Sequence, residues 1–324
     1  MSFASIEGQD PALETLKRAL ESGRVHHAYR FEGPEGVGKE LAAFALAQAL
    51  VCEKAERSAC EKCSACRRAM SFSSDEPRVP LHPDVLLVQR GLYKAAGLGS
   101  ASSEQTGISV EQIRRVVLTR SGFPPHEGRA LVIIVRAADE LTISAANALL
   151  KTLEEPGKNT HFILLTSRPS RLLDTVRSRT LAVRFGPLPE PVVARILERN
   201  GASAELAPLA QGSASLALEL ADQERRAETE GFVRAAFEAL EAPDLATAIR
   251  TLEPPSDRRE LRALFGFFAQ SIAARARASV ARDPDQAERE ARRHALVLGA
   301  MDELERNGQP ALVTEAMLAR LRRA

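Results

Sequence analysis

Short apolar runs alternate with amphipathic stretches through the first half of the chain. Five apolar runs bounded by turn residues predict strands that are buried on both faces: AYRF (28–31), DVLLV (84–88), LVIIV (131–135), HFILLTS (161–167) and LAVRF (181–185). Helical periodicity lies between them, as in the segment from Pro11 to Gly23 and in the segment from Ser144 to Pro156. This alternation predicts an α/β fold with a five-stranded parallel sheet covered by helices.

The pattern changes after Phe185. The stretch GPLPEP reads as a linker, and from Val192 onward the periodicity is helical with no convincing strand. Breaks in this helical pattern are expected at 242–244, 253–257 and 282–285. We therefore predict three domains, which are an α/β nucleotide-binding-like domain over 1–186, a small helical lid over 187–222 and an all-α C-terminal domain over 223–324.

Composition places the chain among soluble globular proteins. Of its 324 residues 44% are hydrophobic and 27% are charged, and no window approaches the eighteen or so apolar residues of a membrane span. Glu7 and Asp10 stand where a secretory signal would carry lysines, so a cytoplasmic protein is expected. The 44 basic residues balance 43 acidic ones, and any contact with nucleic acid must therefore be local or shared with partners.

A phosphate-binding loop is predicted between the first strand and the next helix. The spacing is Gly33-x-x-x-x-Gly38-Lys39, with Gly36 inside it. Such glycines let backbone N–H groups turn toward a phosphate, the helix N-terminus adds its positive end and Lys39 adds a charge. ATP is the expected ligand, and the alternative is a glycine-rich turn that binds nothing.

The loop departs from the pattern of an active ATPase in two places. Glu40 stands where a hydroxyl would bind Mg²⁺, and a carboxylate there would repel the phosphates. Arg136 and Ala137 follow the LVIIV strand where an acidic pair would hold the metal, and Asp139 and Glu140 are expected to lie out of reach. Two independent losses predict that ATP hydrolysis is absent, while ATP binding stays open because cradling and cleavage use different groups.

All four cysteines of the chain lie within one window. Their spacing, C-x7-C-x2-C-x2-C, predicts a closed tetrahedral site for a structural Zn²⁺, whose ligands would be Cys52, Cys60, Cys63 and Cys66. The module 52–66 interrupts the α/β domain before the strand at 84–88 and is expected to protrude as a small knob. An iron–sulfur cluster and scattered buried thiols are the alternatives.

Two further stretches carry a family resemblance. NALLKTLEEP (147–156) and FILLTSRPSRLLDTVRSRT (162–180), together with the four-cysteine insertion and the Gly33–Lys39 loop, resemble the AAA+ clamp-loader subunits of bacterial DNA polymerase III. The resemblance covers roughly residues 1 to 220. It is closer to the non-hydrolysing delta prime type than to the gamma/tau motors, because Ser215 stands where a motor has a lid arginine, in addition to the departures at Glu40, Arg136 and Ala137.

The resemblance implies roles for particular residues. Arg179, which follows Ser178, matches an arginine finger presented in trans to the ATP site of a neighbouring motor subunit. Thr166 matches a sensor position beside the nucleotide, although a plain strand-end hydroxyl is an equal alternative. The family further implies a heteropentamer with gamma/tau and delta subunits, in which residues 223–324 join a collar.

The implied function is that of a stator which helps to load the sliding clamp on primed DNA. The chain is not expected to be catalytic alone, and no membrane contact is expected. Two alternatives from other classes remain, which are an active gamma/tau-like ATPase motor and a stand-alone zinc-dependent DNA-binding protein.

Overall fold

The computed structural model describes residues 3–54, 58–74, 78–92, 107–306 and 308–324. The chain divides into two compact units, Met1–Ala217 and Leu218–Ala324. The lid predicted over 187–222 therefore begins in the first unit and ends just inside the second. The boundaries 1–186, 187–222 and 223–324 stay predictions.

A five-stranded parallel sheet forms the centre of the first unit. Its strands are β1 (Ala28–Glu32), β2 (Val85–Val88), β3 (Leu131–Val135), β4 (Thr160–Thr166) and β5 (Leu181–Arg184). The order is β2-β3-β4-β1-β5, and every pair of neighbours is parallel. In register, Glu32 pairs with Thr166 and with Arg184, so the ends of three strands meet at one edge of the sheet. The predicted α/β fold with a five-stranded parallel sheet is confirmed.

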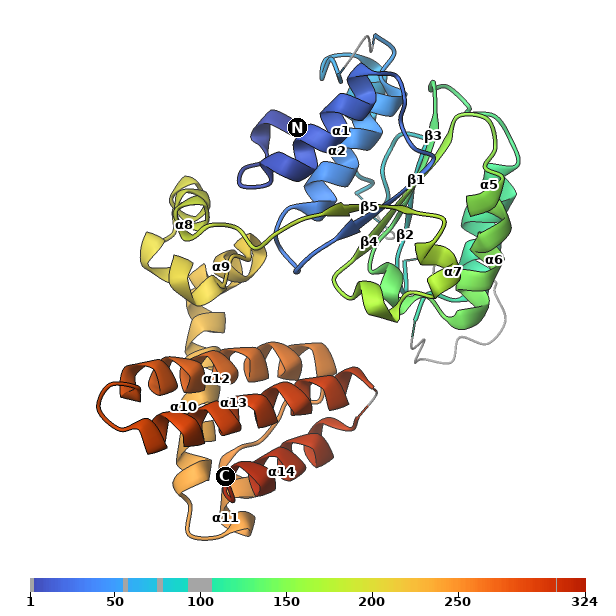
Figure 1. Ribbon diagram of the computed structural model, residues 1–324. Helices are drawn as coiled ribbons and strands as arrows, with labels where there is room; N and C mark the ends of the chain where they lie inside the picture. Colours follow the sequence, from blue (N-terminus) through green and yellow to red (C-terminus); the bar gives the residue numbers. More distant parts are fainter. Residues whose placement is uncertain (1–2, 55–57, 75–77, 93–106, 307) are drawn as a thin grey trace. The chain divides into compact units, whose positions relative to one another are not determined.

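Helices cover both faces of the sheet (Figure 1). On one face lie α1 (Asp10–Glu21) and α2 (Lys39–Val51), and on the other lie α6 (Ile143–Glu154), α7 (Asp174–Arg177) and a helical segment made of α4 (Val110–Gln112), η2 (Ile113–Leu118) and α5 (Thr119–Ser121). Helix α6 buries Ala145, Leu149 and Leu153 against the sheet, as its 3.6-residue period predicts. It begins earlier than Ser144, because the Thr142 hydroxyl caps it by accepting the Ala145 N–H at 3.2 Å.

Short elements complete the first unit. They are η1 (Phe3–Ser5), α3 (Ser64–Ala69), η3 (Ala138–Glu140), η4 (Pro169–Arg171), α8 (Glu190–Arg199), η5 (Ala204–Ala210) and α9 (Ala214–Ala221), the last of which runs on into the second unit. Gln9 joins the linker to the phosphate loop, because its buried amide donates to the carbonyls of Gly186 and Val37 at 2.7 and 3.1 Å.

The second unit is helical throughout the part of it that the structure describes. It contains α10 (Gln223–Glu241), α11 (Leu245–Thr251), α12 (Arg258–Ser279), α13 (Pro284–Glu305) and α14 (Pro310–Leu321), packed around a core that includes Phe265, Phe268 and Leu318. The three expected breaks match the first three connections, whereas the connection between α13 and α14 was not predicted. Asp244 and Asp283 cap α11 and α13 by accepting backbone N–H groups.

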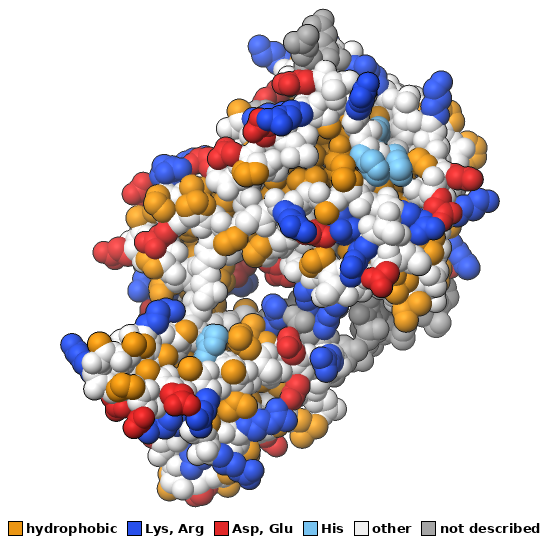
Figure 2. Space-filling view, viewed as in Figure 1, with side chains coloured by type: hydrophobic (Ala, Val, Ile, Leu, Met, Phe, Trp, Pro, Cys, Tyr) orange, Lys and Arg blue, Asp and Glu red, His pale blue; other side chains and the backbone are white. Residues whose placement is uncertain are grey.

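Charge is mixed over the face drawn in Figure 2. Acidic and basic side chains alternate over the face drawn in Figure 2, as the near-neutral composition leads one to expect. Among the described residues no helix combines the length and the apolar character needed to cross a bilayer.

Candidate functional site

The loop Gly33–Lys39, which the sequence predicts to bind phosphate and which we call the phosphate loop, follows the carboxyl end of β1, the usual ligand-binding edge of a parallel sheet. Gly36 at its tip has a φ of +73°, and a Cβ there would lie 2.2 Å from the Ser213 hydroxyl and 2.9 Å from the Ser215 Cβ. The Ala214 N–H donates to the Gly36 carbonyl at 2.9 Å. The N-terminus of α9 therefore packs directly on the loop, and only glycine fits between them.

Lys39 is buried within its own loop. Its side chain, in a residue that is 8% exposed, donates to the carbonyl of Gly33 at 2.5 Å and to that of Pro34. Burial lowers the pKa of Lys39 to about 8, and the charges of Glu35 and Asp139 oppose that shift. The ammonium that could bind a phosphate is thus engaged by backbone oxygens of the loop.

Glu40 and Arg136 are partners in one ion pair. Arg136, directly after β3, extends one guanidinium nitrogen to the Glu40 carboxylate on the first turn of α2 and another to the Gln89 amide oxygen at 2.7 Å. The expectation that the two departures are independent is wrong, since the charge of each side chain is balanced by the other. A guanidinium therefore lies beside Glu40 on the first turn of α2.

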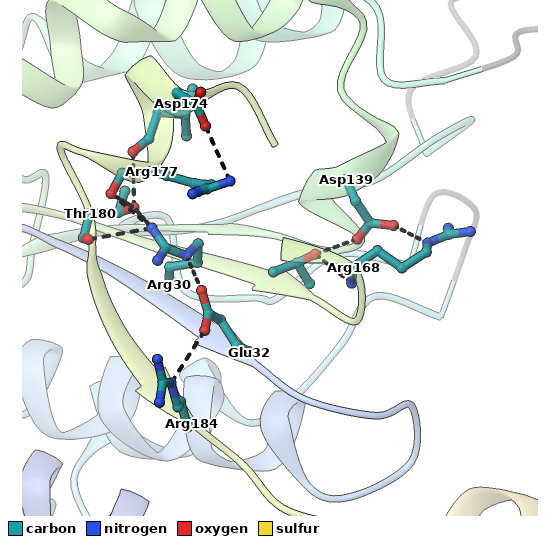
Figure 3. Close-up of polar contacts among 10 residues, drawn as sticks. Arg30, Glu32, Asp139, Arg168, Asp174, Arg177, Thr180 and Arg184 are labelled. Carbon is teal, nitrogen blue, oxygen red and sulfur yellow. Dashed lines mark hydrogen bonds and ion pairs between the residues drawn. The ribbon is translucent and has the colours of Figure 1, made fainter. Parts of the chain in front are cut away.

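Asp139 lies close to Thr166 at the end of β4. Ala137 adopts the left-handed conformation at a φ of +45°, and η3 then turns the chain back toward the end of β4. The Asp139 carboxylate accepts the Thr166 hydroxyl at 2.7 Å and Arg168 Nε at 2.8 Å (Figure 3). Both of its oxygens are engaged, and Glu140 instead pairs with Arg90 at 3.5 Å.

The four cysteines converge on one point. Their sulfurs all lie within 4.8 Å of one another, and the Cys52–Cys63 and Cys60–Cys66 Sγ distances are both 3.9 Å. Four thiolates around a tetrahedral Zn²⁺ at about 2.3 Å would be about 3.8 Å apart, so the donor set fits that ion. Backbone N–H groups approach three of the sulfurs at 3.4 Å.

Part of the cysteine module packs against the α/β fold, and its expected protrusion as a knob stays a prediction. Cys52 and Cys66 are fully buried, and the amide of Gln48 on α2 donates to the Cys66 carbonyl at 3.0 Å. Burial raises the pKa of the Cys52 and Cys66 thiols, whereas the N–H groups of Lys62 and Cys63 lower that of Cys60 to about 6. The module is therefore continuous with the core that supports the phosphate loop.

Arg179 lies in the turn between α7 and β5. Its guanidinium donates to Glu154 at the end of α6 at 2.5 Å and to the Thr175 carbonyl at 2.9 Å, and the side chain is 32% exposed. Beneath this turn lies Arg30, which donates to the Thr180 hydroxyl at 2.6 Å (Figure 3). Sequence reasoning missed Arg30, although a charged residue inside the apolar run AYRF was a signal that it has a specific partner.

Comparisons with known proteins identify the family. The family profile described as DNA polymerase III, delta subunit, matches residues 8–189, which is more than half of the chain. The DNA polymerase III subunit delta' of Pseudomonas aeruginosa is 32% identical over 244 residues, which are 71% of this chain and 67% of that protein. The chain belongs to the delta' family of DNA polymerase III clamp-loader subunits.

Other relatives match a smaller share of their own length. The delta' subunit of Bacillus subtilis is 35% identical over 60% of this chain and 53% of its own length. The gamma/tau subunit of Mycobacterium tuberculosis is 34% identical over 62% of this chain and 32% of its own length. The chain thus spans about half or less of the length of these two proteins. It is similar in sequence to gamma/tau subunits as well as to delta' subunits.

Proposed function

We propose that the chain is a non-hydrolysing delta' subunit of a DNA polymerase III clamp loader. In this role it is a stator in a heteropentamer with gamma/tau and delta subunits, and the complex places the sliding clamp on primed DNA in the cytoplasm. Membership of the delta' family supports this assignment. The AAA+ designation, the lid and the collar formed by residues 223–324 belong to the same proposal.

The Glu40–Arg136 ion pair carries the non-hydrolysing part of the proposal. A metal ion that bridges phosphate oxygens neutralises charge during phosphoryl transfer, and a guanidinium bound to Glu40 competes for the same place. Lys39 engaged by its own loop, and Ser215 in place of an arginine, point in the same direction. ATP binding without cleavage remains compatible with these contacts.

Arg179 is the residue we propose to act on a neighbour. It lies at a partly exposed turn, and its ion pair with Glu154 is accessible to solvent, so a phosphate of an adjoining subunit could replace the carboxylate. An arginine finger supplied in trans contributes about 10³- to 10⁵-fold to the rate of nucleotide hydrolysis in other systems.

Reconstitution with gamma/tau and delta subunits tests the proposal. Arg179→Ala is expected to leave assembly intact and to lower DNA-stimulated ATP hydrolysis by at least about tenfold, because transition-state charge loses its partner. The control is Arg18→Ala, which removes an arginine whose side chain is 74% exposed on α1. Unchanged hydrolysis with Arg179→Ala contradicts the assignment, and repeated turnover by the lone chain would favour the gamma/tau-like motor.

We also propose that the four cysteines bind a structural Zn²⁺. The sulfur spacing and the closed, buried arrangement support a staple without an open catalytic position. The rival reading as a stand-alone zinc-dependent DNA-binding protein finds little support in a net charge of +1 and in the mixed charges of Figure 2.

A further inference from the structure

Arg30 is a buried charge in the central part of the sheet. It lies on β1 between β4 and β5, and the residue is 8% exposed. Its Nε donates to Glu32 at 2.5 Å, and both side chains are largely withdrawn from water, at 10% and 14% exposure. Because a buried pair of this kind seldom adds net stability compared with apolar packing, its geometry calls for a specific explanation.

The guanidinium of Arg30 reaches the turn that carries Arg179. Its Nη1 donates to the Arg177 carbonyl at 2.9 Å and to the Thr180 hydroxyl at 2.6 Å (Figure 3). The Arg177 carbonyl ends α7 and also accepts the Thr180 N–H at 3.4 Å, so the guanidinium is a second and closer donor to it. The Thr180 hydroxyl in turn donates to the Val176 carbonyl at 2.9 Å.

These contacts hold the turn on both sides of Arg179. Arg177 and Thr180 flank the Ser178–Arg179 dipeptide, and both accept hydrogen bonds from the Arg30 side chain. Arg30 in turn donates to Glu32. The backbone of the turn is thereby anchored to the sheet, whereas the Arg179 side chain keeps only partly exposed partners. A side chain with an anchored backbone loses little freedom when it binds a new partner.

We infer that Arg30 is a positioning residue for Arg179, which fixes the turn so that the finger meets the phosphate of the neighbouring subunit in a productive geometry. The inference rests on the proposed trans role of Arg179. Arg30 itself touches no nucleotide, and Glu32 and Thr180 act with it as its acceptor and its anchor on the turn.

The test uses the reconstituted loader with variants of this chain. Arg30→Met keeps an unbranched side chain and removes the guanidinium hydrogen bonds, and Thr180→Val keeps the shape of the side chain and removes one accepting oxygen. We expect kcat for ATP hydrolysis to fall about tenfold with Arg30→Met and about threefold with Thr180→Val, while KM for ATP and assembly stay within twofold. Arg30→Lys, which keeps the charge, should recover part of the loss.

Combination with Arg179→Ala separates positioning from general stability. If Arg30 acts through Arg179, Arg30→Met causes no further loss of kcat in the Arg179→Ala background. A further loss of kcat in that background overturns the inference about Arg30. So does wild-type kcat with both Arg30→Met and Thr180→Val when Arg179→Ala is impaired. Neither outcome affects the proposed function. Wild-type kcat with Arg179→Ala overturns the proposed function instead. Should Arg30→Met fail to fold, Thr180→Val in both backgrounds decides, because it retains the Arg30–Glu32 pair.

Discussion

Glu40 and Arg136 form an ion pair that joins the first turn of α2 to the residue after β3. The two positions are 96 residues apart in sequence, and each side chain supplies the opposite charge that balances the other. Their contact brings a positive group to the edge of the phosphate loop without a metal ion. The loop and the end of β3 are therefore linked through side chains of this chain alone.

A double-mutant cycle should detect this link. With Glu40→Gln, Arg136→Gln and the double variant, we expect a coupling of about 0.5–1 kcal/mol in the free energy of unfolding, because the side chains are 45% and 27% exposed. Urea unfolding of the first unit measures it. The Glu14–Arg18 pair, at 60% and 74% exposure, is the control and should show a smaller coupling. Strictly additive effects at Glu40 and Arg136 would speak against the pair in solution.

Gly36→Ala should destabilise the first unit by about 2–4 kcal/mol. The added Cβ meets Ser213 and Ser215 and also has to adopt a positive φ. Gly23→Ala is the matched control, since its φ is +66° and nothing lies within 4 Å, so it should cost only about 1–2 kcal/mol. Equal losses in chemical unfolding would mean that contact with the start of α9 adds nothing.

Glu154→Gln should release Arg179 from its competing carboxylate. The pair is solvent-accessible, so we expect the affinity of the chain for an ATP-loaded neighbour to rise by up to about fivefold. Binding measured with ATP and without nucleotide would reveal the effect, and Glu155→Gln, at an exposed neighbouring position, should leave the affinity unchanged. Weaker binding with Glu154→Gln would indicate that the carboxylate orients Arg179.

Cys60→Ser should abolish stoichiometric zinc binding. Removal of one of four ligands opens the site, and we expect the midpoint of thermal unfolding to fall by at least about 5 °C. Metal analysis of the purified protein and a thermal melt measure the two effects, and a strong chelator should reproduce the shift. Ser58→Ala, within the same module, is the control. Iron in place of zinc, or a metal-free protein with wild-type stability, would refute the assignment.

Acid should destabilise the first unit through its half-buried histidines. Burial lowers the pKa of His161 and of His26, so the unfolded chain binds more protons than the folded one as the pH falls below about 6.5. The unfolding midpoint should therefore drop between pH 7.5 and 5.5, and His161→Gln should reduce the drop. His126→Gln, at an exposed position, should keep the wild-type pH dependence. A wild-type slope with His161→Gln would assign the effect to other groups.

Much of the fold was predictable because four of the five parallel strands are largely buried on both faces, whereas the edge strand β5 leaves Leu181 and Arg184 exposed, contrary to the prediction. Each of the five apolar runs coincides with an observed strand to within one residue at either end. The sequence spacing also predicted that the four cysteines lie close together, because ligands to one ion must be near one another in space.

The sequence was less informative where the position of a side chain depends on a single backbone angle or on a partner that is distant in the sequence. The position of Asp139 depends on the left-handed Ala137, a conformation that alanine rarely adopts and that no pattern announces. The contacts of Glu40 and Arg30 join residues about 100 or more positions away, beyond the reach of local periodicity. Charge within an apolar strand marked Arg30 as unusual but did not name its partner.

The Ala214 N–H donates to the Gly36 carbonyl and so joins the start of α9 to the tip of the phosphate loop. Ser213 and Ser215 lie so close to Gly36 at the loop tip that no side chain fits between them and the loop. A motif search would count this chain among nucleotide binders because of Gly33, Gly38 and Lys39. In this protein the contact with the start of α9 already accounts for the glycine at position 36, so that glycine is no evidence for a bound nucleotide.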